Sequence, residues 1–197
     1  MIDKQVIEQR LLWQSALLMF MVAISGTLMG VFTGSAAVLL DGIVSFMAVI
    51  IKIMMIMTSK LISRETSKRF QFGYWQFEPL VLIVEGGFTL LFVIYALMTG
   101  IMSLLGPGTI VKAGPIVIYA LVFTIADAAY YFYVHAVNKR LKSNLVKFDN
   151  ISWSIDAVLS AGILISFLFA WGLEQTEWAI YARYVDPVVL IALSIQM

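Results

Sequence analysis

Five ionisable side chains lie inside the apolar segments of this sequence: Asp41, Lys52, Glu85, Asp127 and Asp156. An ionisable group at membrane depth costs roughly 2.5–3.5 kcal/mol on insertion scales, and such groups tend to mark ion pathways or binding sites. Asp41 and Asp156 are the most informative pair, because each lies on a narrow polar face of an apolar segment. Two such carboxylates are suited to holding a cation, and they imply no covalent chemistry.

Helical spacing defines the two polar faces, because residues at i, i+4, i+7 and i+11 share one side of a helix. The first face consists of Asp41, Ser45, Ala48 and Lys52, and the second of Asp149, Ser152, Asp156 and Ser160. Brought together, the two faces form an oxygen-lined cavity with two formal negative charges, which suits a hard divalent cation. The alternative is that the aspartates are protonated or hydrogen-bonded packing residues between helices.

The remaining polar residues have simpler interpretations. Lys52 is expected to neutralise a buried acid, either Asp127 or Glu85, or to act as a gating charge. Glu85 and Asp127 are either proton carriers or salt-bridged structural groups. His135 is the single histidine, and we interpret it as a polar residue at a helix end rather than a metal ligand.

The composition indicates that membrane helices position these residues. Hydrophobic residues make up 61% of the chain and charged ones 13%, with a mean hydropathy of +0.95. A soluble domain carries about 25% charged residues, so this composition suits a lipid environment. The absence of cysteine excludes disulfides and thiolate sites, and the short basic segments show no nucleic-acid footprint.

We expect six apolar spans, of which each complete one exceeds the roughly 20 residues that cross the hydrocarbon core. They cover residues 11–32, 36–61, 79–105, 115–136 and 151–173, and a sixth begins at 186. The sixth run is too short to cross, which suggests a truncated helix. The first is too long for a secretory signal and is read as a retained helix. The predicted fold is an all-α bundle of six transmembrane helices, a single transmembrane domain over residues 1–197.

Small residues predict how closely the helices pack, and the distribution of basic residues predicts how the bundle is oriented in the membrane. Gly26, Gly30 and Gly34 recur every fourth residue, which predicts close helix packing, and Gly34-Ser35 makes a tight connection. Ten basic residues fall on one side of the predicted bundle if the helices alternate, and two on the other. By the positive-inside rule, the N-terminus and the end of the sixth helix are cytoplasmic. The ten are Lys4, Arg10, Lys60, Arg64, Lys68, Arg69, Lys139, Arg140, Lys142 and Lys147; the two are Lys112 and Arg183.

Three segments resemble the cation diffusion facilitator (cation efflux) family. They are TGSAAVLLDGIVSFMAV around Asp41, RFQFGYWQFEPL leading to Glu78, and FDNISWSIDAVLSAG around Asp156. The resemblance covers essentially the whole chain, with six helices and both termini inside. The loop and second-helix motifs together are moderately specific, and none suffices alone.

Carried over residue by residue, the resemblance implies a metal site of Asp41 and Ser45 on one helix with Ser152 and Asp156 on another. In that family each helix usually supplies two strong ligands four residues apart, whereas positions 45 and 152 are serine here. Zinc favours nitrogen and sulfur donors, so zinc, cobalt, iron and manganese all remain open as the transported metal. Further candidate ligands for the coordination shell of the metal are Asn150, backbone carbonyls and water.

Two other expectations follow from the same residues. A second metal site found in some family members would fall at Ser67, Phe70 and Tyr74, which chelate poorly, so we expect that site to be absent. Counted from the apolar boundaries, Asp41 lies nearer the outer surface and Asp156 nearer the inner one, by roughly two or three turns. Their helices must extend or shift beyond those boundaries for the two carboxylates to meet.

The resemblance implies secondary transport of a divalent cation out of the cytoplasm in exchange for protons. It further implies a homodimer in a lipid bilayer, expected to be a bacterial cytoplasmic (inner) membrane, without enzymatic activity or cofactor. The family's cytoplasmic C-terminal domain is absent from this sequence. A competing hypothesis is a non-transporting packing or assembly protein whose buried acids are structural. An intramembrane aspartyl hydrolase is weaker, because the Gly-x-Gly-Asp context is missing near the second aspartate.

Overall fold

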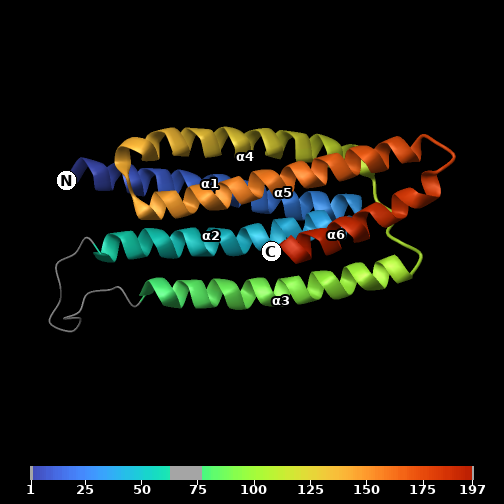
Figure 1. The fold of residues 1–197 in the computed structure, drawn as a ribbon, viewed down its shortest axis with the longest axis horizontal. Helices are drawn as coiled ribbons and strands as arrows, with labels where there is room; N and C mark the ends of the chain where they lie inside the picture. Colours follow the sequence, from blue (N-terminus) through green and yellow to red (C-terminus); the bar gives the residue numbers. More distant parts are fainter. Residues whose placement is uncertain (1, 63–76, 197) are drawn as a thin grey trace.

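The computed structural model describes residues 2–62 and 77–196, and all of its regular structure there is helical (Figure 1). The helices are α1 (Ile2–Thr33), α2 (Ala36–Ile62), α3 (Phe77–Leu105), α4 (Ala113–Leu141), α5 (Asn144–Glu174), the 3-10 helix η1 (Ala179–Tyr184) and α6 (Val185–Gln196). Six segments are long and apolar enough to cross a membrane. The predicted all-α six-helix membrane fold is therefore confirmed.

Two helix boundaries differ from the apolar boundaries in ways that matter for the site. α5 begins at Asn144 and not near Ile151, because the Ser143 hydroxyl caps it by accepting the Val146 N–H at 3.2 Å. The sixth segment was expected to be too short to cross, and that was wrong. η1 and α6 together give an apolar run of 18 residues, Ala179–Gln196, whereas the count from Asp186 had left η1 out.

Glycines set the distance between α1 and α2, which pack along much of their length. A Cβ added to Gly30 would lie 2.5 Å from the Leu39 Cα, and one added to Gly42 would lie 2.3 Å from the Thr27 N. The predicted close packing at Gly26 and Gly30 is thus confirmed, and Gly42 extends it from the α2 side. Gly34 instead forms the turn, with φ +77°.

The start of α2 is fixed by α6. The Asp186 carboxylate accepts the N–H groups of Ala36 and Ala37 at 3.1 and 3.3 Å, and the Ser35 hydroxyl donates to the same carboxylate. Ser35 also caps α2 by accepting the Val38 N–H at 3.1 Å. These contacts fix the height of the first turn of α2, and Asp41 lies one turn further along.

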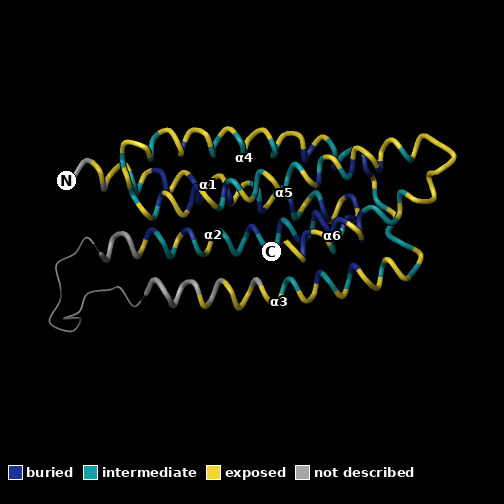
Figure 2. Tube along the Cα trace, in the orientation of Figure 1, coloured by how far each residue is buried: buried dark blue, intermediate teal, exposed yellow. Residues whose placement is uncertain are grey.

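The helices form a bundle whose interior is mainly apolar and contains a smaller group of buried polar side chains. α1 packs on α2, α4 packs on α5, and α2 also contacts α5, so these four helices surround a common core, while α3 packs on α6 and α2. Figure 2 shows exposed residues along the outer faces, and most residues of α3 whose burial is described are exposed. The start of α1, the end of α2 and the α4–α5 connection lie at the same end of the bundle (Figure 1). The basic residues that flank those described ends therefore gather at one end.

Candidate cation site

The structure brings Asp41 and Asp156 together. Asp41 lies on α2 and Asp156 on α5, two helices in contact, and both residues are half-buried. Asp156 interacts electrostatically with Asp41. Because α5 begins at Asn144, before its apolar boundary, Asp156 lies 12 residues into the helix and not near its end.

A third carboxylate, Asp127 on α4, belongs to the same group. Its side chain is 2% exposed and accepts a hydrogen bond from the Ser160 hydroxyl at 2.7 Å. Asp127 interacts electrostatically with both Asp41 and Asp156. Its interaction with Asp41 and Asp156 was not predicted from the sequence. The available signal was its spacing of seven residues from the buried Ala120 and Val134, which places it on the inner face of α4.

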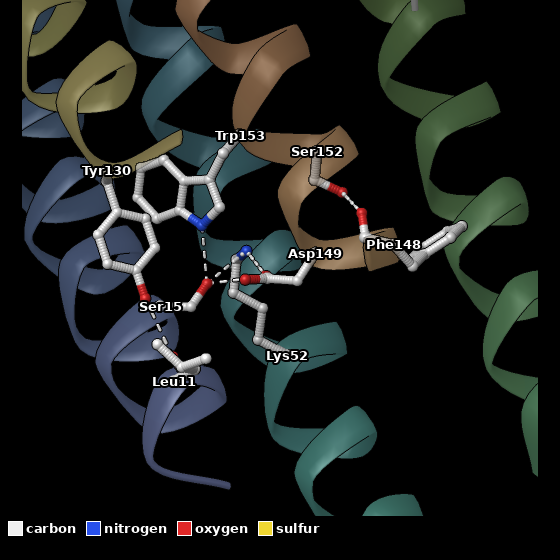
Figure 3. A network of polar contacts seen from close by, with 8 residues as sticks. All are labelled: Leu11, Ser15, Lys52, Tyr130, Phe148, Asp149, Ser152 and Trp153. Atoms are coloured by element: carbon white, nitrogen blue, oxygen red, sulfur yellow. Dashed lines mark hydrogen bonds and ion pairs between the residues drawn. The ribbon is translucent and has the colours of Figure 1, made fainter. Parts of the chain in front are cut away.

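The two serines assigned to the site behave differently from the aspartates. The Ser45 hydroxyl is buried and donates to the backbone carbonyl of Asp41 at 2.8 Å. The Ser152 hydroxyl contacts the Phe148 carbonyl at 3.5 Å, and Figure 3 shows it pointing toward Phe148 and away from the centre of the polar network. Both hydroxyls thus bond to the backbone of their own helix, and a ligand role for either stays a prediction.

Lys52 was expected to pair with Asp127 or Glu85, and that prediction was wrong, because its partner is Asp149. The Lys52 ammonium forms a salt bridge with Asp149 on α5, and both side chains are buried, at 3% and 2% exposure (Figure 3). The expectation that Lys52 neutralises a buried acid is therefore confirmed, with a different acid. The polar face of α5 brings Asp149, two turns before Asp156, to the same side of the helix as Asp156, opposite Lys52 on α2.

Ser15 on α1 connects this ion pair to its neighbours. Its hydroxyl donates to Asp149 at 2.8 Å and accepts from Lys52 at 2.9 Å and from the Trp153 Nε1 at 2.8 Å. The Lys52 ammonium also lies 5.0 Å from the centre of the Trp153 ring. A buried ion pair is costly to desolvate, and these added hydrogen bonds are what make it tolerable in an apolar bundle.

The network joins four helices into one layer. Tyr130 on α4 packs against Trp153, with ring centroids 4.6 Å apart, and its hydroxyl donates to the Leu11 carbonyl at 3.0 Å. Lys52 also interacts electrostatically with Asp156. The bundle therefore holds two adjacent polar layers, the carboxylates Asp41, Asp127 and Asp156, and the neutralised pair Lys52–Asp149.

Other sequence candidates contribute less. His135 is exposed and stacks on Tyr131 with ring centroids 5.8 Å apart, as expected for a polar residue at a helix end. The side chain of Asn150 is buried, and its carbonyl oxygen lacks a hydrogen-bond partner among the described residues. Ser67, Phe70 and Tyr74, and the side chains of Glu78 and Glu85, lie outside the described part of the structure.

The arrangement as it stands is open rather than closed around an ion. Within residues 2–62 and 77–196, no three His, Cys, Asp or Glu side chains that the structure describes converge closely enough to hold a metal ion. Ionised carboxylates in a low-dielectric interior repel one another.

Comparison with known proteins assigns the family. The cation efflux transmembrane domain matches residues 12–197, which is nearly the whole chain. A search of curated proteins finds no match. Since the match includes α2, α4 and α5 with their aspartates, the chain belongs to the cation efflux family.

Proposed function

We propose that this protein exports a divalent metal cation from the cytoplasm in exchange for protons, with Asp41 and Asp156 binding the cation. Family membership supports metal cation transport as the general activity. The observation that supports the site is the packing of α2 on α5, which places two half-buried carboxylates within range of an electrostatic interaction. Hard divalent cations favour such oxygen donors, and a bound cation offsets the cost of ionised carboxylates in an apolar bundle.

Exchange for protons follows from competition at the same oxygens. A carboxylate binds a metal only when it is deprotonated, so metal binding releases protons and protonation favours metal release. In the proposed cycle the cation enters from the cytoplasm, the helices reorient, and protons on Asp41 and Asp156 replace the cation on the outer side. The protonated carboxyls are neutral, which permits the empty site to return.

The types of donor atom at the site indicate which metal it prefers. Serine hydroxyls at positions 45 and 152 supply only oxygen, which favours manganese or ferrous iron over zinc or cobalt. Ser45 and Ser152 are proposed as weak ligands at most, because each hydroxyl bonds to its own backbone. By family likeness we further propose a homodimer in a bacterial cytoplasmic membrane.

The competing explanation is that the buried acids serve only helix packing. Their contacts distinguish an acid suited to packing from those suited to cation binding. Asp149 has its charge neutralised by Lys52. Asp41, Asp127 and Asp156 repel one another across three helices, an arrangement that costs stability without a cation or protons. A purely packing role therefore fits Asp149 and does not fit the three clustered carboxylates.

The test is transport by the purified chain in liposomes that contain a divalent-cation indicator and a pH dye. With an imposed proton gradient, the wild-type protein should move Mn²⁺ against protons, whereas Asp41→Ala and Asp156→Ala should lower the rate at least about tenfold. Ser154→Ala is the matched control on α5, because its hydroxyl bonds to the Ile151 carbonyl of its own helix.

Two results would contradict the proposal in different ways. If the wild-type protein moves none of Mn²⁺, Fe²⁺, Co²⁺ or Zn²⁺, or if both alanine variants transport as wild type, the assigned function is wrong. If metal moves without any change in the pH dye, export stands and proton exchange does not.

A further inference from the structure

Tyr119 on α4 carries a polar group that the transport site as described does not use. Its side chain is 7% exposed, and its hydroxyl has no hydrogen-bond partner within the described part of the chain. A buried hydroxyl without a partner is uncommon, because desolvation is not offset by a new bond. Such a group calls for a ligand or a second arrangement in which it is paired.

The backbone of the bundle makes room for this hydroxyl. A Cβ added to Gly26 would lie 2.8 Å from the Tyr119 hydroxyl oxygen and 3.0 Å from the Gly42 Cα. The hydroxyl therefore reaches the α1–α2 contact next to Gly42, the residue that follows Asp41. It interacts electrostatically with both Asp41 and Asp127.

Asp127 extends the same group of oxygens. Its side chain is 2% exposed, and one of its two carboxylate oxygens accepts a hydrogen bond from the Ser160 hydroxyl. Asp127 lies about two turns beyond Tyr119 along α4. The α4 helix thus supplies a buried acid and an unpaired phenol to the region of Asp41 and Asp156. By contrast, the hydroxyls of Ser45 and Ser152 are directed to their own backbones.

We propose that α4 completes the cation site, with Asp127 as a third carboxylate ligand and Tyr119 as the residue that positions the carboxylates for a hard divalent cation such as Mn²⁺. This inference rests on the proposed transport function and replaces the two serines as the source of the missing ligands. When ionised, Asp41, Asp127 and Asp156 repel one another. A divalent cation removes that repulsion and draws them together, and the Tyr119 hydroxyl then donates to a carboxylate oxygen.

The experiment measures Mn²⁺ binding to the full chain in lipid nanodiscs by calorimetry, together with the electron paramagnetic resonance spectrum of the bound ion. Asp127→Asn should weaken Mn²⁺ binding about 10- to 100-fold and alter the spectrum, because a ligand is lost. Asp127→Glu should recover part of the affinity, since it restores a carboxylate. Tyr119→Phe should weaken binding about threefold to tenfold, the effect of one hydrogen bond.

Matched variants separate this from general damage to the bundle. Tyr130→Phe removes a hydroxyl from the same helix that bonds to the Leu11 carbonyl, and it should change Mn²⁺ affinity less than about twofold. Ser45→Ala and Ser152→Ala should also change it less than about threefold.

The inference is overturned if Asp127→Asn and Tyr119→Phe bind Mn²⁺ like wild type while Asp41→Ala and Asp156→Ala do not. It is also overturned if the two serine variants lose as much affinity as Asp127→Asn. In both cases the proposed function survives. Absence of binding by the wild-type protein to Mn²⁺, Fe²⁺, Co²⁺ and Zn²⁺ would instead remove the proposed function and this inference with it.

Discussion

At the scale of single residues, the interior of this bundle holds charges in two different ways. Lys52 and Asp149 are buried, paired, and further bonded to Ser15, so their charges cancel locally. Asp41 and Asp156 bear like charges when ionised, and of the two only Asp156 interacts favourably with Lys52. The first arrangement is a satisfied structural pair, and the second is the one we propose as a cation site.

The pair Lys52–Asp149 gives a prediction on stability. Lys52→Met or Asp149→Leu alone should destabilise the protein by about 3–5 kcal/mol, because each leaves an unpaired buried charge. The double variant replaces both groups with apolar side chains and should recover most of that loss. Thermal unfolding in detergent, followed by tryptophan fluorescence, measures all three. Equal melting temperatures for the wild type and both single variants would show that the pair is not buried as described.

At the scale of helices, the contact between α1 and α2 depends on glycines because the two backbones approach each other directly. Gly30 faces the Leu39 backbone and Gly42 faces Thr27, while Ser35 and Asp186 fix the first turn of α2. These contacts determine the height of Asp41 in the bundle. The long α5, capped by Ser143, determines the height of Asp156.

The glycine contact predicts a position-dependent effect of one added methyl group. Gly30→Ala should destabilise the protein by about 1–3 kcal/mol, because its Cβ would lie 2.5 Å from the Leu39 Cα and the helices must separate. Gly162→Ala in the middle of α5 is the control, since nothing lies within 4 Å of its added Cβ. That control should be neutral or stabilising by up to about 1 kcal/mol. Melting temperatures that rank the two variants in the opposite order would contradict the packing.

At the scale of the whole molecule, the basic residues gather at one end of the helix bundle, which predicts how it is oriented in the membrane. The start of α1, the end of α2 and the α4–α5 connection lie at one end of the bundle, and the described basic residues there include Lys4, Lys139 and Arg140 (Figure 1). The positive-inside rule then predicts that this end is cytoplasmic. The Lys52–Asp149 layer would lie between that end and the carboxylates.

The absence of cysteine makes this orientation testable without removing native thiols. Lys139→Cys and Glu177→Cys place single thiols at exposed positions at opposite ends of the bundle. In intact cells, a membrane-impermeant maleimide should label the cysteine at position 177, and the cysteine at position 139 should react only after lysis. The reverse pattern would invert the bundle and the proposed direction of export.

The sequence by itself determined the membrane class, six helical segments and the family, because span length and hydropathy are local properties of the chain. It also identified the buried aspartates, since an ionisable group in an apolar run is visible without a structure. It did not determine which acid Lys52 pairs with, because Asp149 lies 97 residues away and only helix packing brings the two together.

Tertiary structure likewise decides which side chains lie near Asp41 and Asp156. The spacing on α2 and α5 favoured Ser45 and Ser152, but their hydroxyls bond to backbone carbonyls one turn earlier, a local competition that side-chain spacing does not reveal. Asp127 and Tyr119 come from α4, whose relation to Asp41 depends on three helices packing around a common centre. We therefore propose Asp41 and Asp156 as the core of the site, with α4 as the source of the further groups Asp127 and Tyr119.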